Sequence, residues 1–199
     1  MEDLIIFIRN CTAREVRGAL LENDLKRRMG CRVVRLVSRS REFLVQELFS
    51  ALQAIADAKA AYIFFLEDDM TYTNSIAADL REAIDLGYPF VQFSVPEQRY
   101  LHTPLDEKTY VLRVEEFHYS GAYLMKMAFL REFLAEQIFG SDVVDDQHFD
   151  LLITRYLSRQ NYPLILRPSV AATQLGLESA LGNVYKAQDP LFDYSLSVI

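Results

Sequence analysis

Short apolar stretches recur along the first half of the chain, at residues 4–8, 32–37, 61–66 and 90–95. Each is shorter than an ordinary helix, and β-branched or aromatic residues are frequent in them. The almost uninterrupted apolar runs at 4–8 and 61–66 are typical of strands that are buried on both faces of a parallel sheet. The pattern therefore predicts four strands.

The segments between these strands carry helical patterns. Apolar residues between positions 44 and 56 recur at steps of one, three and four, which places them on one helical face. Thr12 and Glu15 have the spacing of a capping box, and Gly30 and Gly87 stand where a first and a third helix should end. Alternating strands and helices predict a single-domain α/β fold, in which a doubly wound, mostly parallel central sheet is flanked by helices. Ligands of such folds bind at the carboxyl ends of the strands.

The pattern changes after residue 96. Two extended segments, two helices, a strand and a tail are expected at about 110–114, 118–125, 127–139, 146–159, 163–166 and 183–199. We expect the two extended segments to form a floor or flap over the site. Residues 1–199 form one domain in this interpretation, with a nucleotide-binding part at about 1–95, an acceptor-side part at about 96–182 and a C-terminal tail at 183–199.

The charge balance narrows the range of partners. The 28 acidic side chains outnumber the 21 lysines and arginines, so the formal net charge is −7 and general nucleic-acid binding is disfavoured. No stretch reaches the length of a membrane span, and the amino terminus does not resemble a signal peptide. Cys11 and Cys31 lack CxxC spacing, which favours reduced thiols over a disulfide. These features favour a cytoplasmic protein without a membrane span.

Three carboxylates, Glu67, Asp68 and Asp69, directly follow the apolar run 61–66. Because like charges beside a buried strand repel one another, this placement calls for a cation, and Mg²⁺ or Mn²⁺ prefers such oxygen ligands. Side chains alternate along an extended strand end, so we expect Glu67 and Asp69 to face the ion and Asp68 to point the other way. The alternative is that Asp68 or Asp69 only caps a following helix.

The segment Ala61-Tyr-Ile-Phe-Phe-Leu-Glu-Asp-Asp-Met70 resembles the metal-binding segment of GT-A glycosyltransferases. The resemblance is to the subgroup whose DxD motif reads Glu-Asp-Asp, which includes the N-glycan branching N-acetylglucosaminyltransferases. It implies a Rossmann-like GT-A fold in which Asp69 binds Mn²⁺ or Mg²⁺ on the donor diphosphate. It also implies that Glu67 reaches the ribose or a metal-bound water, and that Asp68 belongs to the nucleotide-sugar site.

Two further segments resemble parts of the same family. Residues 119–123, Tyr-Ser-Gly-Ala-Tyr, resemble the segment that lines the donor-sugar pocket, which implies that Ser120 and Gly121 contact the sugar. A simple extended turn at Gly121 is the alternative. Residues 168–179 resemble a region of the branching enzymes in which Leu175 replaces a histidine, so the third protein ligand of the metal is missing from that position.

A second acidic group, Asp145, Asp146 and Asp150, opens the helix expected at 146–159. Carboxylates at a helix start are stabilised by the helix dipole, which alone accounts for one aspartate. The resemblance implies that one of them is the general base for the acceptor hydroxyl, with Asp146 as the first choice and Asp145 as the second, and inversion at the anomeric carbon.

The residues after the first strand complete the candidate site. The resemblance places Arg9, Asn10, Thr12 and Arg14 beside the nucleoside and diphosphate, although Thr12 could act only as a cap and the arginines could lie on the surface. The implied substrates are a nucleotide sugar, with a UDP-sugar favoured, and a glycan or other hydroxyl-bearing acceptor.

Two alternatives stay open. One is another metal-dependent nucleotide-processing enzyme, such as a nucleotidyltransferase or phosphohydrolase, although residues 7–17 contain no glycine-rich phosphate loop. The other is a binding protein that keeps the fold without turnover, which the leucine at position 175 raises.

Overall fold

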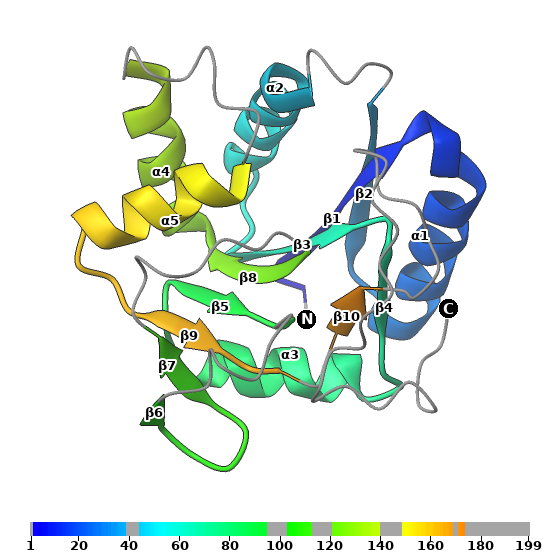
Figure 1. Cartoon of the computed structure of the whole chain (residues 1–199). Coiled ribbons are helices and arrows are strands. Elements are labelled where there is room, and N and C mark those ends of the chain that lie inside the picture. Colours follow the sequence, from blue (N-terminus) through cyan, green and yellow to red (C-terminus); the bar gives the residue numbers. More distant parts are fainter. Residues whose placement is uncertain are drawn as a thin grey trace.

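A computed structural model of the chain describes residues 2–38, 44–94, 103–112, 121–139, 149–168 and 171–173. Its centre is an eight-stranded sheet with the strand order β2-β1-β3-β8-β5-β9-β7-β6 (Figure 1). The strands are β1 (Leu4–Cys11), β2 (Arg32–Ser38), β3 (Tyr62–Glu67), β5 (Phe90–Gln92), β6 (Thr103–Pro104), β7 (Tyr110–Leu112), β8 (Ala122–Lys126) and β9 (Leu164–Leu166). Strands from both sides of residue 96 therefore share one sheet.

Strand directions in this sheet are mixed. Strand β1 runs parallel to β2 and β3, and β5 runs parallel to β9. Strand β8 is antiparallel to both β3 and β5, and β7 is antiparallel to β9 and β6. The predicted α/β class is confirmed. The sheet is mixed, however, and not mostly parallel as expected. Because β8 is antiparallel to both of its neighbours, β3 and β5 point the same way. The same direction is shared by β1, β2 and β9, so the carboxyl ends of all five strands lie at one edge of the sheet.

The position of β8 corrects a second expectation. The extended segment at about 118–125 was expected to cover the site as a floor or flap, whereas its described part, β8, lies in the middle of the sheet between β3 and β5. Residues Ala122, Tyr123, Leu124 and Met125 are all buried there. A strand with apolar side chains on both faces buries the most apolar surface where helices cover both faces of the sheet, which explains its central position.

Helices cover both faces of the sheet (Figure 1). On one face, α1 (Glu15–Met29) and α3 (Ile76–Asp85) pack through Leu21 and Leu80 against Ile6 and Phe64 of the strands. On the other face lie α2 (Leu44–Ala56), α4 (Met127–Phe139) and α5 (Phe149–Arg159), which form a second core with alternate strand residues such as Phe65. The alternation of Phe64 and Phe65 between the two cores shows which face each later residue of β3 meets.

The helix ends match the sequence patterns only in part. Gly30 and Gly87 adopt the left-handed conformation, with φ of 60° and 73°, as predicted for residues that end helices. The predicted capping box at Thr12 is wrong, because Thr12–Arg14 forms a short 3-10 turn (η1) and α1 has no side-chain cap. The Thr12 hydroxyl instead donates a hydrogen bond to the carbonyl of Ser38, 3.1 Å away at the end of β2. A tertiary partner has replaced the local one.

A small second sheet follows the acidic triplet. Strand β4 (Met70–Tyr72) pairs antiparallel with β10 (Ala171–Thr173), and Met70 lies opposite Thr173. Because α3 begins only at Ile76, neither Asp68 nor Asp69 caps a helix, and that alternative is excluded. The two aspartates form the turn between β3 and β4.

Two further observations concern the whole described part of the chain. None of its helices has the length and apolar character needed to span a membrane. Both cysteines, Cys11 and Cys31, are free thiols in this structure.

Candidate active site

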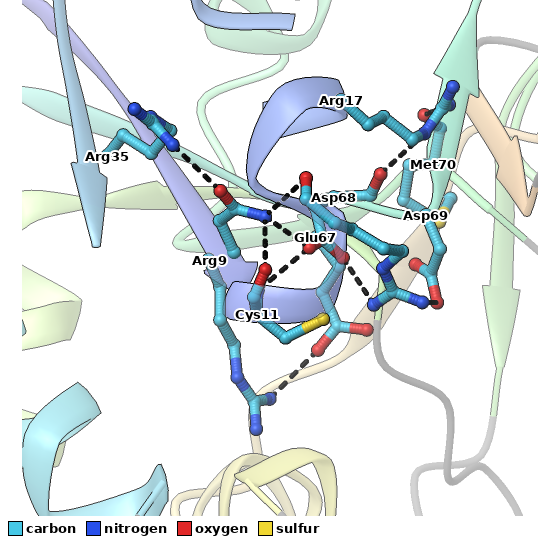
Figure 2. Close-up of polar contacts among 10 residues, drawn as sticks. Arg9, Cys11, Arg17, Arg35, Glu67, Asp68, Asp69 and Met70 are labelled. Carbon is cyan, nitrogen blue, oxygen red and sulfur yellow. Dashed lines mark hydrogen bonds and ion pairs between the residues drawn. The ribbon is translucent and has the colours of Figure 1, made fainter. Parts of the chain in front are cut away.

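The acidic triplet lies at the carboxyl edge of the sheet, where β1 and β3 end side by side (Figure 2). Glu67 is the last residue of β3 and pairs in register with Arg9 of β1. The amide of Asp68 still donates to the carbonyl of Arg9, so the turn starts from a fixed strand end. Parallel strands with common carboxyl ends are the usual place for ligand sites in α/β folds.

Asp68 is the most enclosed of the three carboxylates, with 2% of its side chain exposed. It accepts hydrogen bonds from the side-chain amide of Asn10 and from the backbone amide of Cys11, and it forms an ion pair with Arg14. Asn10 also donates to the carbonyl of Arg14, directly before α1. A buried carboxylate with these partners ties β3 to the start of α1, and its oxygens are committed to protein donors.

Glu67 faces the other side of the sheet, toward α5, because it follows Phe65 by two residues. Its carboxylate accepts a 2.9 Å hydrogen bond from Nη1 of Arg9 (Figure 2). Burial raises the pKa of Glu67 to about 7; the Arg9 charge opposes this rise, whereas Asp69, Asp68 and Asp150 add to it. Glu67 is therefore held near the border between its neutral and charged forms at neutral pH.

Asp69 is buried but is bound less tightly than Asp68. Its carboxylate lies 3.6 Å from Nη1 of Arg14, the same guanidinium that pairs with Asp68. Burial raises the pKa of Asp69, and the Arg14 charge counteracts part of that rise. The chain turns after Glu67, so the strand alternation that the sequence analysis extended to Asp69 ends there, and Asp68 and Asp69 share one arginine.

Arg17, which was not among the predicted site residues, also reaches this turn. Its Nε donates to the carbonyl of Asp68 over 2.7 Å, and its Nη2 donates to the carbonyl of Met70 over 2.8 Å. Arg14 and Arg17 are three residues apart at the start of α1, a spacing that brings side chains to one side of a helix. That spacing was the available signal in the sequence.

Gly18 explains how α1 comes so close to β1. A Cβ atom at this position would lie 2.2 Å from Oδ1 of Asn10, so one of the two groups would have to move. A glycine inside a helix indicates a close approach of this kind. Arg35 of β2 holds the same Oδ1 through a 2.9 Å hydrogen bond from Nη1, so the Asn10 amide is fixed from both ends.

The charges of the triplet are balanced by the chain itself. Arg9 pairs with Glu67, Arg14 pairs with Asp68 and Asp69, and Arg17 places a third cation beside the turn. The crowding of carboxylates therefore does not by itself demand a metal ion. Within the described ranges, no group of three or more His, Cys, Asp or Glu side chains is arranged to hold one.

The donor set nevertheless fits one particular kind of metal binding. Glu67 and Asp69 offer hard carboxylate oxygens at the strand end, and the ion pair of Asp69 with Arg14 is a long one, at 3.6 Å. One or two carboxylates completed by substrate phosphates is the usual arrangement for Mg²⁺, whereas a protein cage needs more ligands. The residues present therefore fit an ion that is shared with a diphosphate.

The other predicted site residues divide into two groups. Gly121 lies beside the triplet: its carbonyl accepts the amide of Glu67, and a Cβ there would lie 2.8 Å from Sδ of Met70. Its φ of 152° also disfavours other residues. Asp150 at the start of α5 lies close enough to raise the pKa of Glu67. Ser120, Asp145, Asp146 and Leu175 lie outside the described residues.

Comparisons with known proteins add little to this picture. No protein-family model matches the chain, and no curated protein matches it in sequence. The crystal structure of A197 from STIV is similar over 87% of this chain and 82% of that chain, with a TM-score of 0.49 and 15% sequence identity. A likeness at this level does not assign a family or an activity, so function has to be argued from the site.

Proposed function

We propose that the protein is a metal-dependent glycosyltransferase that moves a sugar from a nucleotide-sugar donor to an acceptor hydroxyl. The observation that carries this proposal is the placement of Glu67 and Asp69 at the carboxyl end of β3. Arg9 of the adjoining β1 pairs with Glu67, and Arg14, at the end of η1, pairs with Asp69. Carboxylates for a divalent ion and arginines for phosphate oxygens thus occur together at one strand end. The Glu-Asp-Asp resemblance supports the same substrate class.

The residues take different roles under this proposal. Asp69 and Glu67 would hold Mn²⁺ or Mg²⁺, which when bound stabilises the negative charge of the departing diphosphate. Arg9 and Arg14 bind and orient the phosphates, since a guanidinium can donate two hydrogen bonds to one phosphate. Asp68 does not contact the donor, because its oxygens are occupied by Asn10, Cys11 and Arg14. It fixes the turn to α1 instead.

The acceptor side of the proposed site involves Gly121 and the two aspartates at positions 145 and 146. The missing side chain of Gly121 makes room for Sδ of Met70, so the contact of Gly121 with the sugar that the resemblance implies would be made through the backbone. The acceptor hydroxyl would lose its proton to Asp146 or, as the second choice, Asp145. A UDP-sugar is the favoured donor, and a glycan or other hydroxyl-bearing molecule the favoured acceptor. These parts of the proposal come from the sequence resemblance.

Donor hydrolysis tests the proposal directly. The purified protein is incubated with Mn²⁺ and a panel of nucleotide sugars, and free nucleoside diphosphate and free sugar are measured. We expect release from a subset of donors, loss of release without Mn²⁺, and loss by at least about a hundredfold in Asp69→Asn. Asp85→Asn removes an exposed carboxylate at the end of α3 and serves as the matched control, with release unchanged.

The same assay separates the alternatives. A phosphohydrolase would split the diphosphate with water into nucleoside monophosphate and sugar phosphate. A nucleotidyltransferase would release sugar phosphate and nucleoside triphosphate once pyrophosphate is added as the acceptor of the nucleotidyl group. No glycine lies between the end of β1 and the start of α1, where a phosphate loop of such enzymes would be expected.

A binding protein without turnover is the second candidate. The observation that favours it is the contact of Arg14 with both Asp68 and Asp69, which balances their charge without any other cation. Saturable binding of a nucleotide sugar in calorimetry, combined with no release under any condition of the donor panel, would select this candidate.

A further inference from the structure

Arg17 of α1 donates hydrogen bonds to the backbone of the acidic turn, residues 68–70 (Figure 2). Its two hydrogen bonds, at 2.7 and 2.8 Å, end on the carbonyl oxygens of Asp68 and Met70. These two carbonyls lie on either side of Asp69 in the chain. The guanidinium therefore holds the peptide unit before Asp69 and the one after Met70 at the same time.

These two hydrogen bonds affect the direction of the Asp69 side chain. Asp68 is oriented by Asn10, Cys11 and Arg14, whereas the contact of Asp69 with Arg14 is 3.6 Å long. A side chain with weak contacts takes its direction from its backbone. Because the turn follows directly on β3, the carbonyls held by Arg17 decide where the Asp69 carboxylate points.

The chemistry of the contact requires an arginine. A guanidinium presents several N–H donors in a rigid plane and can serve two acceptors in fixed directions, whereas a lysine ammonium acts as a point charge on a flexible stem. The cation also lies near enough to attract Asp68 and Asp69 electrostatically. Arg17 thus places a partly buried charge against two neutral carbonyls. This arrangement is explained if the site requires a fixed backbone geometry in the turn.

We propose that Arg17 is a positioning residue, which acts through the backbone of the turn to aim Asp69 at the divalent ion. The proposal rests on the function proposed above, in which Asp69 is a metal ligand. Arg17 itself does not contact the donor. Groups that orient a metal ligand typically change metal affinity by about 10–100-fold when they are removed.

Calorimetric titration of Mn²⁺ into the protein saturated with UDP tests this role. In Arg17→Gln we expect the dissociation constant for Mn²⁺ to rise by about 10–100-fold. The affinity for UDP without metal should change less than twofold, because Arg17 does not reach the phosphates in the proposed arrangement. A residue with a purely structural role would lower the unfolding temperature and leave the Mn²⁺ affinity of the folded protein unchanged.

Arg28→Gln is the matched control on the same helix. Arg28 also leaves α1 for other parts of the structure, with contacts to Asp24 and Asn74, but does not touch the acidic turn. The variant should lose stability while binding Mn²⁺ as the wild type does. Arg17→Lys covers the case in which Arg17→Gln does not fold, because it keeps the charge and most of the stem. It too should bind Mn²⁺ less tightly, by at least about fivefold.

The outcomes distinguish this inference from the function on which it rests. If the wild type binds Mn²⁺ with UDP and a folded Arg17 variant binds it equally well, the positioning role is wrong and the proposed function stands. If the wild type binds no Mn²⁺ in the presence of any nucleotide sugar or UDP, the metal-dependent function is wrong, and the role of Arg17 falls with it.

Discussion

The guanidinium of Arg14 lies 3.6 Å from the carboxylate of Asp69, too far for a hydrogen bond and close enough for strong attraction between unlike charges. The same group pairs with Asp68. Arg14 therefore occupies the position of a cation beside the proposed metal ligand. A divalent ion at Asp69 would have to weaken this contact, and a diphosphate would offer Arg14 a new partner.

Removal of Arg14 should change metal and nucleotide binding in opposite directions. In Arg14→Gln we expect Mn²⁺ alone to bind about tenfold more tightly or better, because a competing positive charge is gone. UDP in the presence of saturating Mn²⁺ should bind about tenfold more weakly, because a charged donor to its phosphates is lost. Calorimetry of both ligands measures the two effects.

Arg27→Gln supplies the control for net charge. Arg27 lies on α1, is largely exposed and pairs with Asp24, away from the acidic turn. Both affinities should stay within twofold of the wild type. Weaker binding of Mn²⁺ alone in Arg14→Gln would show that Arg14 supports the ion site and does not compete with the ion.

The raised pKa of Glu67 predicts a pH dependence of stability. Burial raises this pKa from its ordinary value of 4.5 to about 7, so between these values the folded state keeps a proton that the unfolded state releases. The free energy of unfolding therefore falls as pH rises through this window. Glu67→Gln lacks the titration, so its stability relative to the wild type should increase across the same window, by about 3 kcal/mol at most.

Urea unfolding at a series of pH values measures this difference, and Glu82 provides a control of opposite sign. Arg167 lowers the pKa of Glu82, so that contribution to stability is present above pH 4.5 and lost as pH falls through the lowered value. Glu82→Gln should therefore lose stability relative to the wild type as pH rises toward 4.5, and its relative stability should stay level above that value. A relative stability of Glu67→Gln that is equally level between pH 4.5 and 7 would contradict the assignment of the Glu67 pKa.

Local patterns in the sequence predicted the elements around the site well. The apolar run before Glu67 forms β3, and Gly30 ends α1 in the left-handed conformation. Both features depend on neighbouring residues alone, through burial of short apolar strands and the conformational freedom of glycine. The position of the acidic triplet at a strand end followed from the same local evidence.

Partners from distant parts of the chain explain what the sequence did not predict. A central antiparallel strand and a strand on a flap can have similar apolar patterns, so the place of β8 depends on its pairing with β3 and β5. The Thr12 hydroxyl donates to a carbonyl on β2 and does not cap the helix as predicted. The crowded carboxylates indicated a cation, but only the folded chain brings Arg14 and Arg17 to them.

The packing of Gly18 against Asn10 supplies a test of how rigidly the site is built. Alanine favours a helix interior over glycine by about 1 kcal/mol, so Gly18→Ala would stabilise an unhindered helix. Here the new Cβ would lie 2.2 Å from Oδ1 of Asn10, whose amide is held by Asp68 and Arg35. Overpacking against a fixed group costs about 1–3 kcal/mol, so we expect a net loss of stability.

A double-mutant cycle assigns that loss to the contact. In an Asn10→Ala background the obstacle is gone, so Gly18→Ala should become stabilising by about 1 kcal/mol, as helix propensity alone requires. Asn10→Ala alone should be destabilising, because buried Asp68 loses a donor. Urea unfolding followed by circular dichroism gives all four stabilities. If Gly18→Ala stabilises the wild-type background too, the Asn10 amide can move, and with it the carboxylate of Asp68 that fixes the turn carrying Asp69.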